Sequence, residues 1–201
     1  MSHYFEDIKH EKDDYFEFLD EVNNHSFSFL SCNNVFSKEK IDYGTKVLLN
    51  TILKNYTTLK SNVLDIGCGY GAIGVVLSYN YKNTQFLMSD ITQTAVELAK
   101  INLQKNNIKN ANVIKSDLYE NISGVFDFII TNPPIKVGKK VLTTLIEESH
   151  KHLNIGGQII LVIKKSHGKD SIKKYMEETF LNCEVLKREK GYYILKSERE
   201  V

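Results

Sequence analysis

The stretch Val63-Leu-Asp-Ile-Gly-Cys-Gly-Tyr-Gly-Ala-Ile-Gly74 joins an apolar run of strand length to a turn that is rich in glycine. Glycine adopts backbone conformations that other residues avoid, so the chain can turn sharply here and approach a ligand closely. We therefore predict a strand that carries Asp65, followed by a glycine loop and then a helix.

Around this stretch, apolar runs of strand length alternate with helical patterns. The runs cover residues 63–66, 86–88, 111–114, 125–130 and 158–163. Apolar residues at helical spacing predict helices over 92–104 and 139–153, and Gly156-Gly157 is expected to end the second. Residues 183–188 and 192–196 flank a turn too short for a crossover helix, so they should form an antiparallel hairpin. This order predicts an α/β fold with a mostly parallel sheet, helices on both faces and an antiparallel C-terminal hairpin.

The N-terminal part, residues 1–58, is expected to pack on a core formed by residues 59–201. Residues 26–30 and 35–36 flank a short polar turn and predict a small hairpin, followed by a helix over about 42–53. The first 22 residues are acidic and aromatic and are expected to form an arm or a short helix. Packing roles are expected for three aromatic residues, Phe27, Phe29 and Tyr43.

With 201 residues and a net charge of +1, the chain has the size and composition of one globular domain. No apolar stretch approaches the ~20 residues that cross a bilayer, and the N-terminus lacks the pattern of a secretory signal. Three widely spaced cysteines indicate neither a disulfide framework nor a zinc site. We therefore expect a cytoplasmic monomer that needs no metal and no membrane. Residues 1–21 hold eight of the 25 acidic residues and two of the 26 basic ones, so the remainder has a net charge of +7, which permits an anionic partner.

Four polar residues lie at the ends of successive predicted strands, namely Asp65, Asp90, Asp117 and Asn132. Because the carboxyl ends of parallel strands meet at one edge of a sheet, we expect these side chains to converge on one crevice. Buried carboxylates are costly without a partner, which favours a ligand site over an accident of packing.

The glycine loop matches the dinucleotide fingerprint Gly-x-Gly-x-x-Gly from Gly69 to Gly74, but Asp65 just ahead of it would repel a pyrophosphate. An NAD-dependent oxidoreductase is therefore disfavoured. The same carboxylate suits a ligand with an ammonium and a sulfonium, as in S-adenosylmethionine. Asp90 is placed to accept from two ribose hydroxyls, and Asp117 from an adenine amine. The alternative is that Asp90 and Asp117 only cap the helices that follow them.

The only two prolines of the chain, Pro133 and Pro134, follow Asn132 at the end of the run 125–130. Two successive prolines stop a buried strand and leave its last carbonyl groups pointing outward. The side-chain oxygen of Asn132 and the carbonyl of Pro133 can together accept from the two hydrogens of a planar amine. The alternative is a turn that only ends the strand.

Two groups of lysines are expected to border the same crevice, where phosphates of an RNA loop can bind. They are Lys136, Lys139 and Lys140 in the first group and Lys164, Lys165, Lys169, Lys173 and Lys174 in the second. The alternative is that these lysines cover solvated helix faces.

These motifs resemble those of the class I S-adenosylmethionine-dependent methyltransferases over residues 60–197, through the stretch 63–71, Asp90, Ser116-Asp117 and the final hairpin. Asn132-Pro-Pro-Ile135 looks like the signature of members that methylate an exocyclic amine or an amide nitrogen. The segments 35–45 and 132–140 look most like the small-subunit (16S) ribosomal RNA guanine-N2 methyltransferases. Enzymes of that family typically have two tandem halves, and this chain matches only the functional half.

The resemblance implies a Rossmann-like methyltransferase fold with seven strands, S-adenosylmethionine as cofactor and S-adenosylhomocysteine as product. It implies that the catalytic residues are Asn132, Pro133, Pro134 and Ile135. It implies that the cofactor-binding residues are Thr45, Asp65, Gly67, Cys68, Gly69, Tyr70, Gly71, Asp90, Ile91, Ser116, Asp117, Leu118 and Asn132. Phe36 is expected to close over the cofactor together with Thr45.

The implied substrate is the N2 amine of an unpaired or flipped guanine in ribosomal RNA or in the small ribosomal subunit. Ile135 favours guanine, because relatives that act on DNA adenine or protein glutamine usually have an aromatic residue there. Three alternatives stay open: a protein glutamine-N5 methyltransferase, a DNA or RNA adenine-N6 methyltransferase, and a non-catalytic cofactor-binding assembly module.

Overall fold

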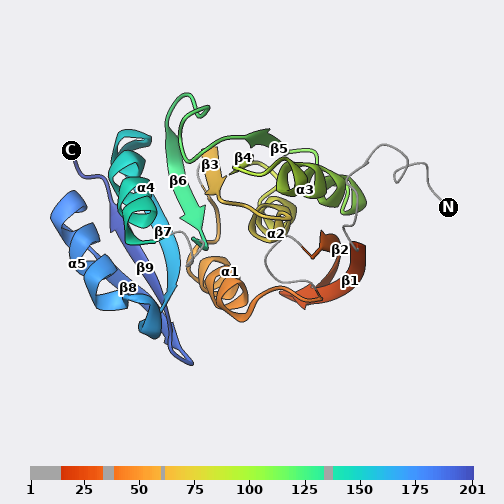
Figure 1. The fold of residues 1–201 in the computed structure, drawn as a ribbon, viewed down its shortest axis with the longest axis horizontal. Helices are drawn as coiled ribbons and strands as arrows, with labels where there is room; N and C mark the ends of the chain where they lie inside the picture. Colours follow the sequence, from red (N-terminus) through yellow and green to blue (C-terminus); the bar gives the residue numbers. More distant parts are fainter. Residues whose placement is uncertain (1–14, 34–38, 60–61, 134–137) are drawn as a thin grey trace.

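A computed structural model describes residues 15–33, 39–59, 62–133 and 138–201. In this part of the chain the main sheet has seven strands in the order β5-β4-β3-β6-β7-β9-β8 (Figure 1). The strands are β3 (Asn62–Ile66), β4 (Gln85–Asp90), β5 (Ala111–Lys115), β6 (Phe126–Thr131), β7 (Leu153–Lys164), β8 (Glu184–Glu189) and β9 (Tyr192–Glu198). The first five in sheet order are parallel, and β9 is antiparallel to both β7 and β8. The predicted mostly parallel sheet with an antiparallel C-terminal hairpin is confirmed.

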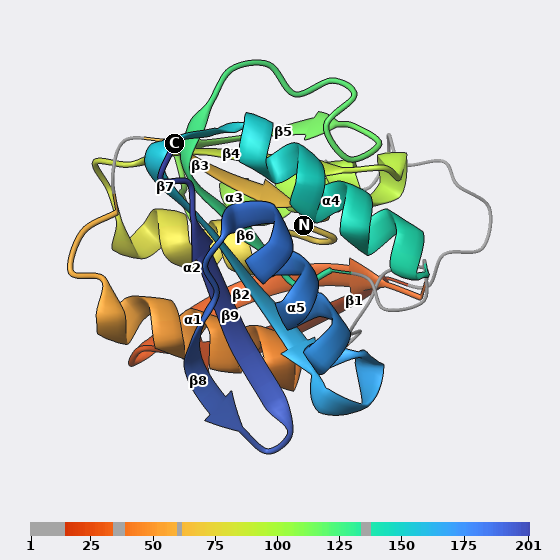
Figure 2. The same ribbon diagram turned by 90° about the vertical axis from the view of Figure 1, so that its left-hand side faces the viewer.

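Helices cover both faces of this sheet. They are α1 (Tyr43–Asn55), α2 (Ala72–Asn80), α3 (Gln93–Lys105), α4 (Lys139–Lys151) and α5 (Lys169–Phe180). The first three pack against one face, and α4 and α5 pack against the other (Figures 1 and 2). Alternate residues of β7 belong to the two cores, with Ile160 on the side of α1 and Ile159 and Leu161 on the side of α4 and α5. Within the described residues, no helix is both long and apolar enough to cross a membrane.

A second, two-stranded sheet precedes α1 and consists of β1 (Tyr15–Val22) and β2 (His25–Cys32). The predicted pairing of residues 26–30 with 35–36 is wrong, because 26–30 pair with 17–21 across the turn Asn23-Asn24. Both turn residues have positive φ, which suits a two-residue hairpin turn and which asparagine tolerates. The expected arm or short helix is also wrong for residues 15–22, which form a strand, while residues 1–14 and 34–38 lie outside the described part.

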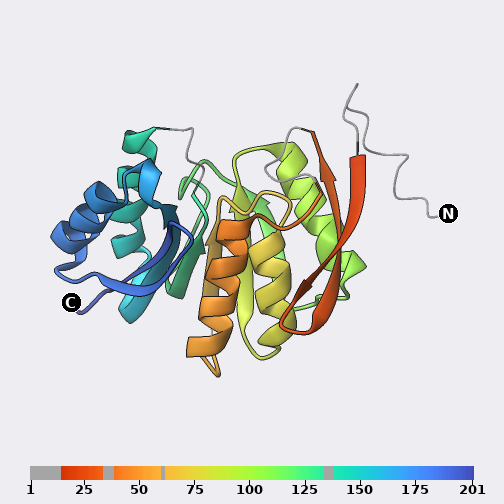
Figure 3. The same cartoon turned by 90° about the horizontal axis from the view of Figure 1, so that it is seen from below.

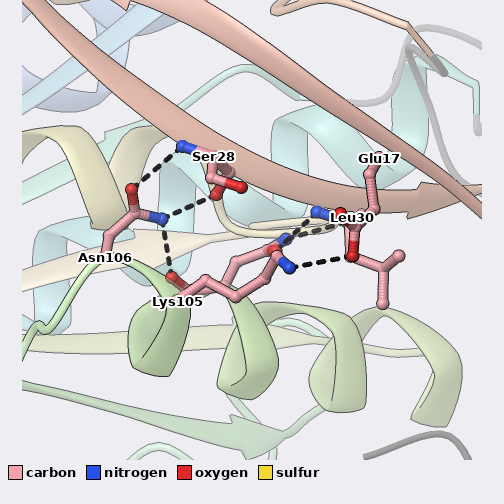
Figure 4. A network of polar contacts seen from close by, with 6 residues as sticks. Glu17, Ser28, Leu30, Lys105 and Asn106 are labelled. Carbon is pink, nitrogen blue, oxygen red and sulfur yellow. Dashed lines mark hydrogen bonds and ion pairs between the residues drawn. The ribbon is translucent and has the colours of Figure 1, made fainter. Parts of the chain in front are cut away.

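The hairpin of β1 and β2 lies outside α3, at the end of the molecule away from α5 (Figure 3). Asn102 in α3 and Asn106 at its C-cap bind the backbone of β2 through both polar atoms of their amides, and Figure 4 shows Asn106 beside Ser28. Asn106 binds Ser28 at 3.1 and 2.7 Å, and Asn102 binds Leu30 at 2.7 and 2.9 Å. These side chains act as a neighbouring strand would and satisfy part of the free edge of β2. Lys105 adds an ion pair with Glu17 at 2.9 Å.

Two glycines that were expected to end a helix lie inside a strand instead. The helix α4 ends at Lys151, and Leu153 already belongs to β7, so Gly156-Gly157 are strand residues. A Cβ on Gly157 would lie 3.0 Å from the carbonyl oxygen of Phe126 in β6. Glycine at this position therefore permits a close approach of two backbones, which a helical pattern read along the chain does not reveal.

Candidate functional site

The parallel strands β3, β4, β5 and β6 run toward the same edge of the sheet, and the predicted polar residues follow this geometry. Asp65 is the penultimate residue of β3 and Asp90 is the last residue of β4. Asp117 lies just after β5, and Asn132 directly follows β6. The fold thus brings all four residues to one edge, as the sequence predicts.

The glycine loop between β3 and α2 presents backbone to this edge. Gly67, Gly69 and Gly71 have φ values of 71°, 56° and 96°, in the region that favours glycine. A Cβ on Gly71 would lie 2.8 Å from Cε of Met88, whereas a Cβ on Gly69 would meet nothing within 4 Å. Gly71 is therefore needed for close packing, and Gly69 leaves open space at the edge.

Asp65 is fully buried, and only one of its carboxylate oxygens has a protein partner. Oδ2 accepts from the backbone N–H of Gly74 at 2.9 Å, while Oδ1 has no hydrogen-bond partner. Burial raises the pKa of Asp65 from 3.8 to about 7, the hydrogen bond from Gly74 lowers it, and the charge of Asp90 raises it. A buried carboxyl oxygen is costly unless a proton or a ligand donor pairs with it. The site therefore fits a ligand with a cationic or donor group beside Asp65.

This buried carboxyl predicts a pH dependence of stability. The pKa of Asp65 in the folded protein, about 7, lies above the ordinary value of 3.8, so the folded protein keeps a proton that the unfolded chain releases between these values. The resulting stabilisation is complete below about pH 4 and is lost as the pH rises through about 7, at up to about 1.4 kcal/mol per pH unit. Thermal unfolding of the ligand-free protein should show this decline, and Asp65→Asn should flatten it. Identical pH profiles for both proteins would refute this origin.

Asp90 holds the glycine loop from the side of β4. Its Oδ2 accepts from the backbone N–H of Gly69 at 2.9 Å, and its Oδ1 accepts from the backbone N–H and the hydroxyl of Thr92 at 3.0 and 3.1 Å. The alternative that Asp90 caps the next helix is wrong, because Thr92 is the N-cap of α3 and accepts from the N–H of Ala95. Asp90 is partly exposed and has lone pairs left for a ligand.

The end of β5 completes this side of the edge. Ser116 is buried, its N–H donates to the carbonyl of Asp90 at 2.9 Å, and its hydroxyl donates to the carbonyl of Leu118 at 2.8 Å. Asp117 is exposed and begins a turn, so it caps no helix, and its carboxylate accepts no hydrogen bond from the described residues. Ile91 is 55 % exposed directly after Asp90. An apolar side chain beside free acceptors is the combination that a nucleoside needs.

On the other side of the glycine loop, the N-terminus of α1 holds the amide of Asn132. Nδ2 donates to Oγ1 of Thr45 at 2.8 Å and to Oδ2 of Asp42 at 3.1 Å. Asp42 is the N-cap of α1 and also accepts from the N–H of Thr45. Since a carboxylate only accepts, the amide must turn its NH2 group toward Asp42 and its Oδ1 away. Oδ1 accepts no hydrogen bond from the described residues.

Several predicted site residues lie elsewhere or outside the described part. The ring of Tyr70 packs on Phe18 and Phe29 at 5.8 and 5.5 Å, because the hairpin covers this face, so its side chain does not reach the edge. Cys68 is also buried, and burial raises the pKa of its thiol. Phe27 and Phe29 are core residues, as predicted. Pro133 is buried after Asn132, whereas Phe36, Pro134, Ile135 and Lys136 lie outside the described residues.

The lysines of the two predicted groups differ in whether an acid pairs with them. On α5, Lys173 pairs with Glu177 and Lys174 with Glu178, each one helical turn on, so the solvated-face alternative holds for them. Lys169 pairs with Asp170. Lys139 and Lys140 are exposed in the first turn of α4.

Sequence reasoning missed two anchoring residues. The sequence placed Asp42 only at the start of a predicted helix. An acidic residue followed three positions later by a threonine is a recognisable N-cap pattern, so Asp42 could have been identified as the helix cap. Asn102 lies on the otherwise apolar buried stripe of the predicted helix 92–104, where it is fully buried and donates to the carbonyl of Tyr70 in the glycine loop at 2.8 Å. A polar residue in such a stripe was the available signal.

Comparison with known proteins places this site in context. The family described as methyltransferase small domain matches residues 26–196. The uncharacterized protein YbxB of Bacillus subtilis is 37% identical over 180 residues, which cover 89% of each chain. Ribosomal RNA small subunit methyltransferase C of Haemophilus influenzae is 38% identical over 141 residues, which cover 68% of this chain and 42% of that protein.

Among solved structures, a similar one is the Thermus thermophilus 16S rRNA N2 G1207 methyltransferase RsmC, in complex with AdoMet and guanosine. The two structures share a TM-score of 0.84 and 25% sequence identity over 92% of this chain and 50% of that one. This chain therefore spans about half the length, or less, of these ribosomal RNA methyltransferases.

Proposed function

Because the chain belongs to the methyltransferase small domain family, and is thus an S-adenosylmethionine-dependent methyltransferase, we propose that it methylates the exocyclic N2 amine of a guanine in small-subunit ribosomal RNA. The similarity to ribosomal RNA small subunit methyltransferase C supports this substrate, and so does Ile135 in the sequence.

One observation carries the proposal, namely the orientation of the Asn132 amide. Asp42 and Thr45 both accept from Nδ2, which leaves Oδ1 as a fixed acceptor at the sheet edge. The carbonyl of Pro133 is a second acceptor next to it in the chain. Two acceptors bind the two hydrogens of an amine. They would repel an alkoxide, a thiolate or a ring nitrogen that carries no hydrogen.

The acceptors also explain how the transfer is accelerated. S-adenosylmethionine supplies the electrophilic methyl group. The lone pair of a guanine amine is delocalised into the ring, and the nitrogen becomes tetrahedral and positive as it attacks. Acceptors aimed at its hydrogens therefore bind the transition state more tightly than the ground state. The remaining task of the protein is alignment of the two reactants.

The cofactor would lie over the glycine loop, on the side of β3, β4 and β5. Oδ1 of Asp65 is a buried acceptor without a partner, and Asp90 and Asp117 have lone pairs for hydroxyl and amine donors. Gly69 leaves open space, and Ile91 offers an apolar surface. The backbone of the loop, held by Asn102 and Asp90, supplies a rigid base for this ligand.

Nucleoside mass spectrometry of small-subunit ribosomal RNA tests the proposal. RNA from cells that lack the gene should contain less N2-methylguanosine than RNA from wild-type cells, and the purified protein should restore the difference with S-adenosylmethionine. An unchanged level would refute the assignment to ribosomal RNA. Methyl transfer to a release-factor peptide, and none to ribosomal subunits, would favour the glutamine-N5 alternative.

The hydrogen bond from Asn132 to Thr45 predicts the effect of a near-isosteric change. Thr45→Val removes the hydroxyl acceptor, so the amide is held by Asp42 alone and kcat should fall about tenfold, which corresponds to about 1.4 kcal/mol. Thr45→Ser should restore kcat, and a loss of cofactor affinity in Thr45→Val would support the cofactor contact that the resemblance implies for Thr45. Steady-state kinetics with small ribosomal subunits and calorimetry with S-adenosylhomocysteine measure these quantities.

Thr51→Val is the matched control. Thr51 is buried in the same helix, and its hydroxyl donates to the carbonyl of Val47 at 2.6 Å, away from Asn132. It should leave kcat unchanged at temperatures where both variants are folded. Equal losses of kcat in both valine variants would show that the effect is a general one on α1.

A further inference from the structure

A second surface reaches the sheet edge that carries Asn132. It lies on the side of Asn132 opposite to the glycine loop. In the sheet order, β6 lies between β3 and β7. The strand β7 ends at Lys164, which pairs with Tyr192 at the start of β9, so the turn between β8 and β9 lies beside the end of β7 (Figure 2). The N–H of Lys165 donates to the carbonyl of Gly191 in this turn at 2.8 Å. We call this the basic edge surface, formed by Tyr43, Lys164, Lys165, Lys190 and Tyr192.

The start of α1 connects the basic edge surface to the amide of Asn132. Asp42 binds that amide, and the next two residues are Tyr43 and Gly44. A Cβ on Gly44 would lie 2.8 Å from the ring of Tyr192, so glycine allows β9 to pack directly on this part of α1. Tyr43 packs at the surface and not in the core, because 36% of it is exposed and its ring lies 5.7 Å from that of Tyr192.

The lysines of this surface form no ion pair with an acid. Within the residues that the structure describes, no carboxylate lies within ion-pair distance of Lys164, Lys165 or Lys190. The acid of this surface is Glu189, which accepts from the hydroxyl of Tyr43 at 2.6 Å and pairs with Lys187 at 3.5 Å. The ammonium of Lys190 lies 5.1 Å from the ring centre of Tyr43, and that of Lys164 lies 5.7 Å from that of Tyr192. A cation–π contact attracts a cation without cancelling its charge. These side chains are thus oriented and still available to an anion.

The lysines of α5 provide the contrast. Lys173 and Lys174 each have a glutamate partner one turn along the helix, so their positive charges are matched within α5. Lys164 and Lys165 at the end of β7 form no ion pair within the described residues, and neither do Lys139 and Lys140 at the start of α4. Lys190, which the sequence did not single out, joins the first two through the β8–β9 turn, whereas the guanidinium of Arg188 lies 5.5 Å from the ring centre of Tyr193 on the α5 side.

We propose that the basic edge surface binds the phosphates of the single-stranded RNA segment that flanks the target nucleotide. This inference rests on the proposed RNA substrate. A base that is methylated on an exocyclic amine has to leave its helix, so the flanking strand is unpaired where it enters the site. The unmatched cations lie on the side of Asn132 that the cofactor does not use, so they bind substrate phosphates and not the cofactor.

Binding of a fluorescein-labelled single-stranded RNA with one unpaired guanosine tests the inference, with S-adenosylhomocysteine present so that no transfer occurs. The triple variant Lys164→Gln/Lys165→Gln/Lys190→Gln should bind this RNA at least about tenfold more weakly than wild type. When the logarithm of its affinity is plotted against the logarithm of the salt concentration, the slope should be smaller in magnitude by about 2, because each lost phosphate contact removes roughly 0.7 from it. Cofactor affinity and thermal stability should stay unchanged.

The matched control removes three paired charges, in Lys151→Gln/Lys173→Gln/Lys174→Gln. It has the same net charge as the test variant and should bind RNA nearly as wild type does. Equal weakening in both triples, or wild-type binding by the test triple, would overturn the inference. If wild type binds RNA through this surface but forms no N2-methylguanosine, the proposed function fails and the surface assignment stands. The reverse result, methylation of guanine with no contribution from this surface, refutes the surface alone.

Discussion

Asn132→Ala is expected to lower kcat by about 10²- to 10³-fold, the effect of removing one group that stabilises developing charge in a transition state. The substitution deletes the acceptor Oδ1 and leaves the carbonyl of Pro133 alone to bind the amine. Because the contact strengthens only as the nitrogen becomes positive, KM for RNA and cofactor affinity should change by no more than about twofold. Single-turnover methylation of small ribosomal subunits measures the loss.

The fold should survive this change, since Asp42 still accepts from the N–H of Thr45 and caps α1. Asn55→Ala is a suitable control, because the Asn55 amide donates only to the carbonyl of Thr51 at the far end of the same helix. It should be as active as wild type. If Asn132→Ala retains wild-type kcat, then the amide does not bind the amine, and the non-catalytic alternative gains support.

Asp90→Asn is expected to weaken S-adenosylmethionine binding by about 10²-fold and to lower the free energy of unfolding by about 1–3 kcal/mol. Each oxygen of Asp90 accepts from a backbone N–H, that of Gly69 on one side and that of Thr92 on the other. An amide in this place must turn its NH2 group toward one of these donors. The glycine loop then loses its support from β4, and one acceptor for the ligand disappears. Calorimetry and thermal unfolding measure the two effects.

Asp117→Asn separates the ligand contribution from the structural one. The carboxylate of Asp117 is exposed and accepts no hydrogen bond from the described residues, so its replacement should leave the free energy of unfolding unchanged. Cofactor affinity should still fall, because the amide has one neutral acceptor oxygen in place of the two oxygens of a charged carboxylate. If Asp117→Asn binds S-adenosylmethionine as wild type does, the charge of Asp117 does not contribute to cofactor binding.

The position of the site was readable along the chain, whereas the contacts within it were not. Glycines, strand periodicity and an acid or amide at each strand end are local features, and the parallel sheet brings those ends together by its topology. The place of the Tyr70 ring was not readable from the sequence, because the ring packs on Phe18 and Phe29 under a hairpin whose pairing was mispredicted. The short turn Asn23-Asn24 defines that pairing, and its positive φ values depend on two residues that also suit an ordinary loop.

Local patterns are enough to predict the order of strands and helices, the glycine loop beside Asp65, and the polar residues at one sheet edge. These features follow from backbone conformation and side-chain periodicity, which act over a few residues. Contacts between distant segments are needed to see that Asp42 and Thr45 orient the amide of Asn132, and that the lysines at the end of β7 lack ion pairs while those on α5 are paired. The residues in these contacts are far apart along the chain. Asp42 meets Asn132 across 90 residues because α1 packs against β7 and β9, and packing of that kind depends on the whole core.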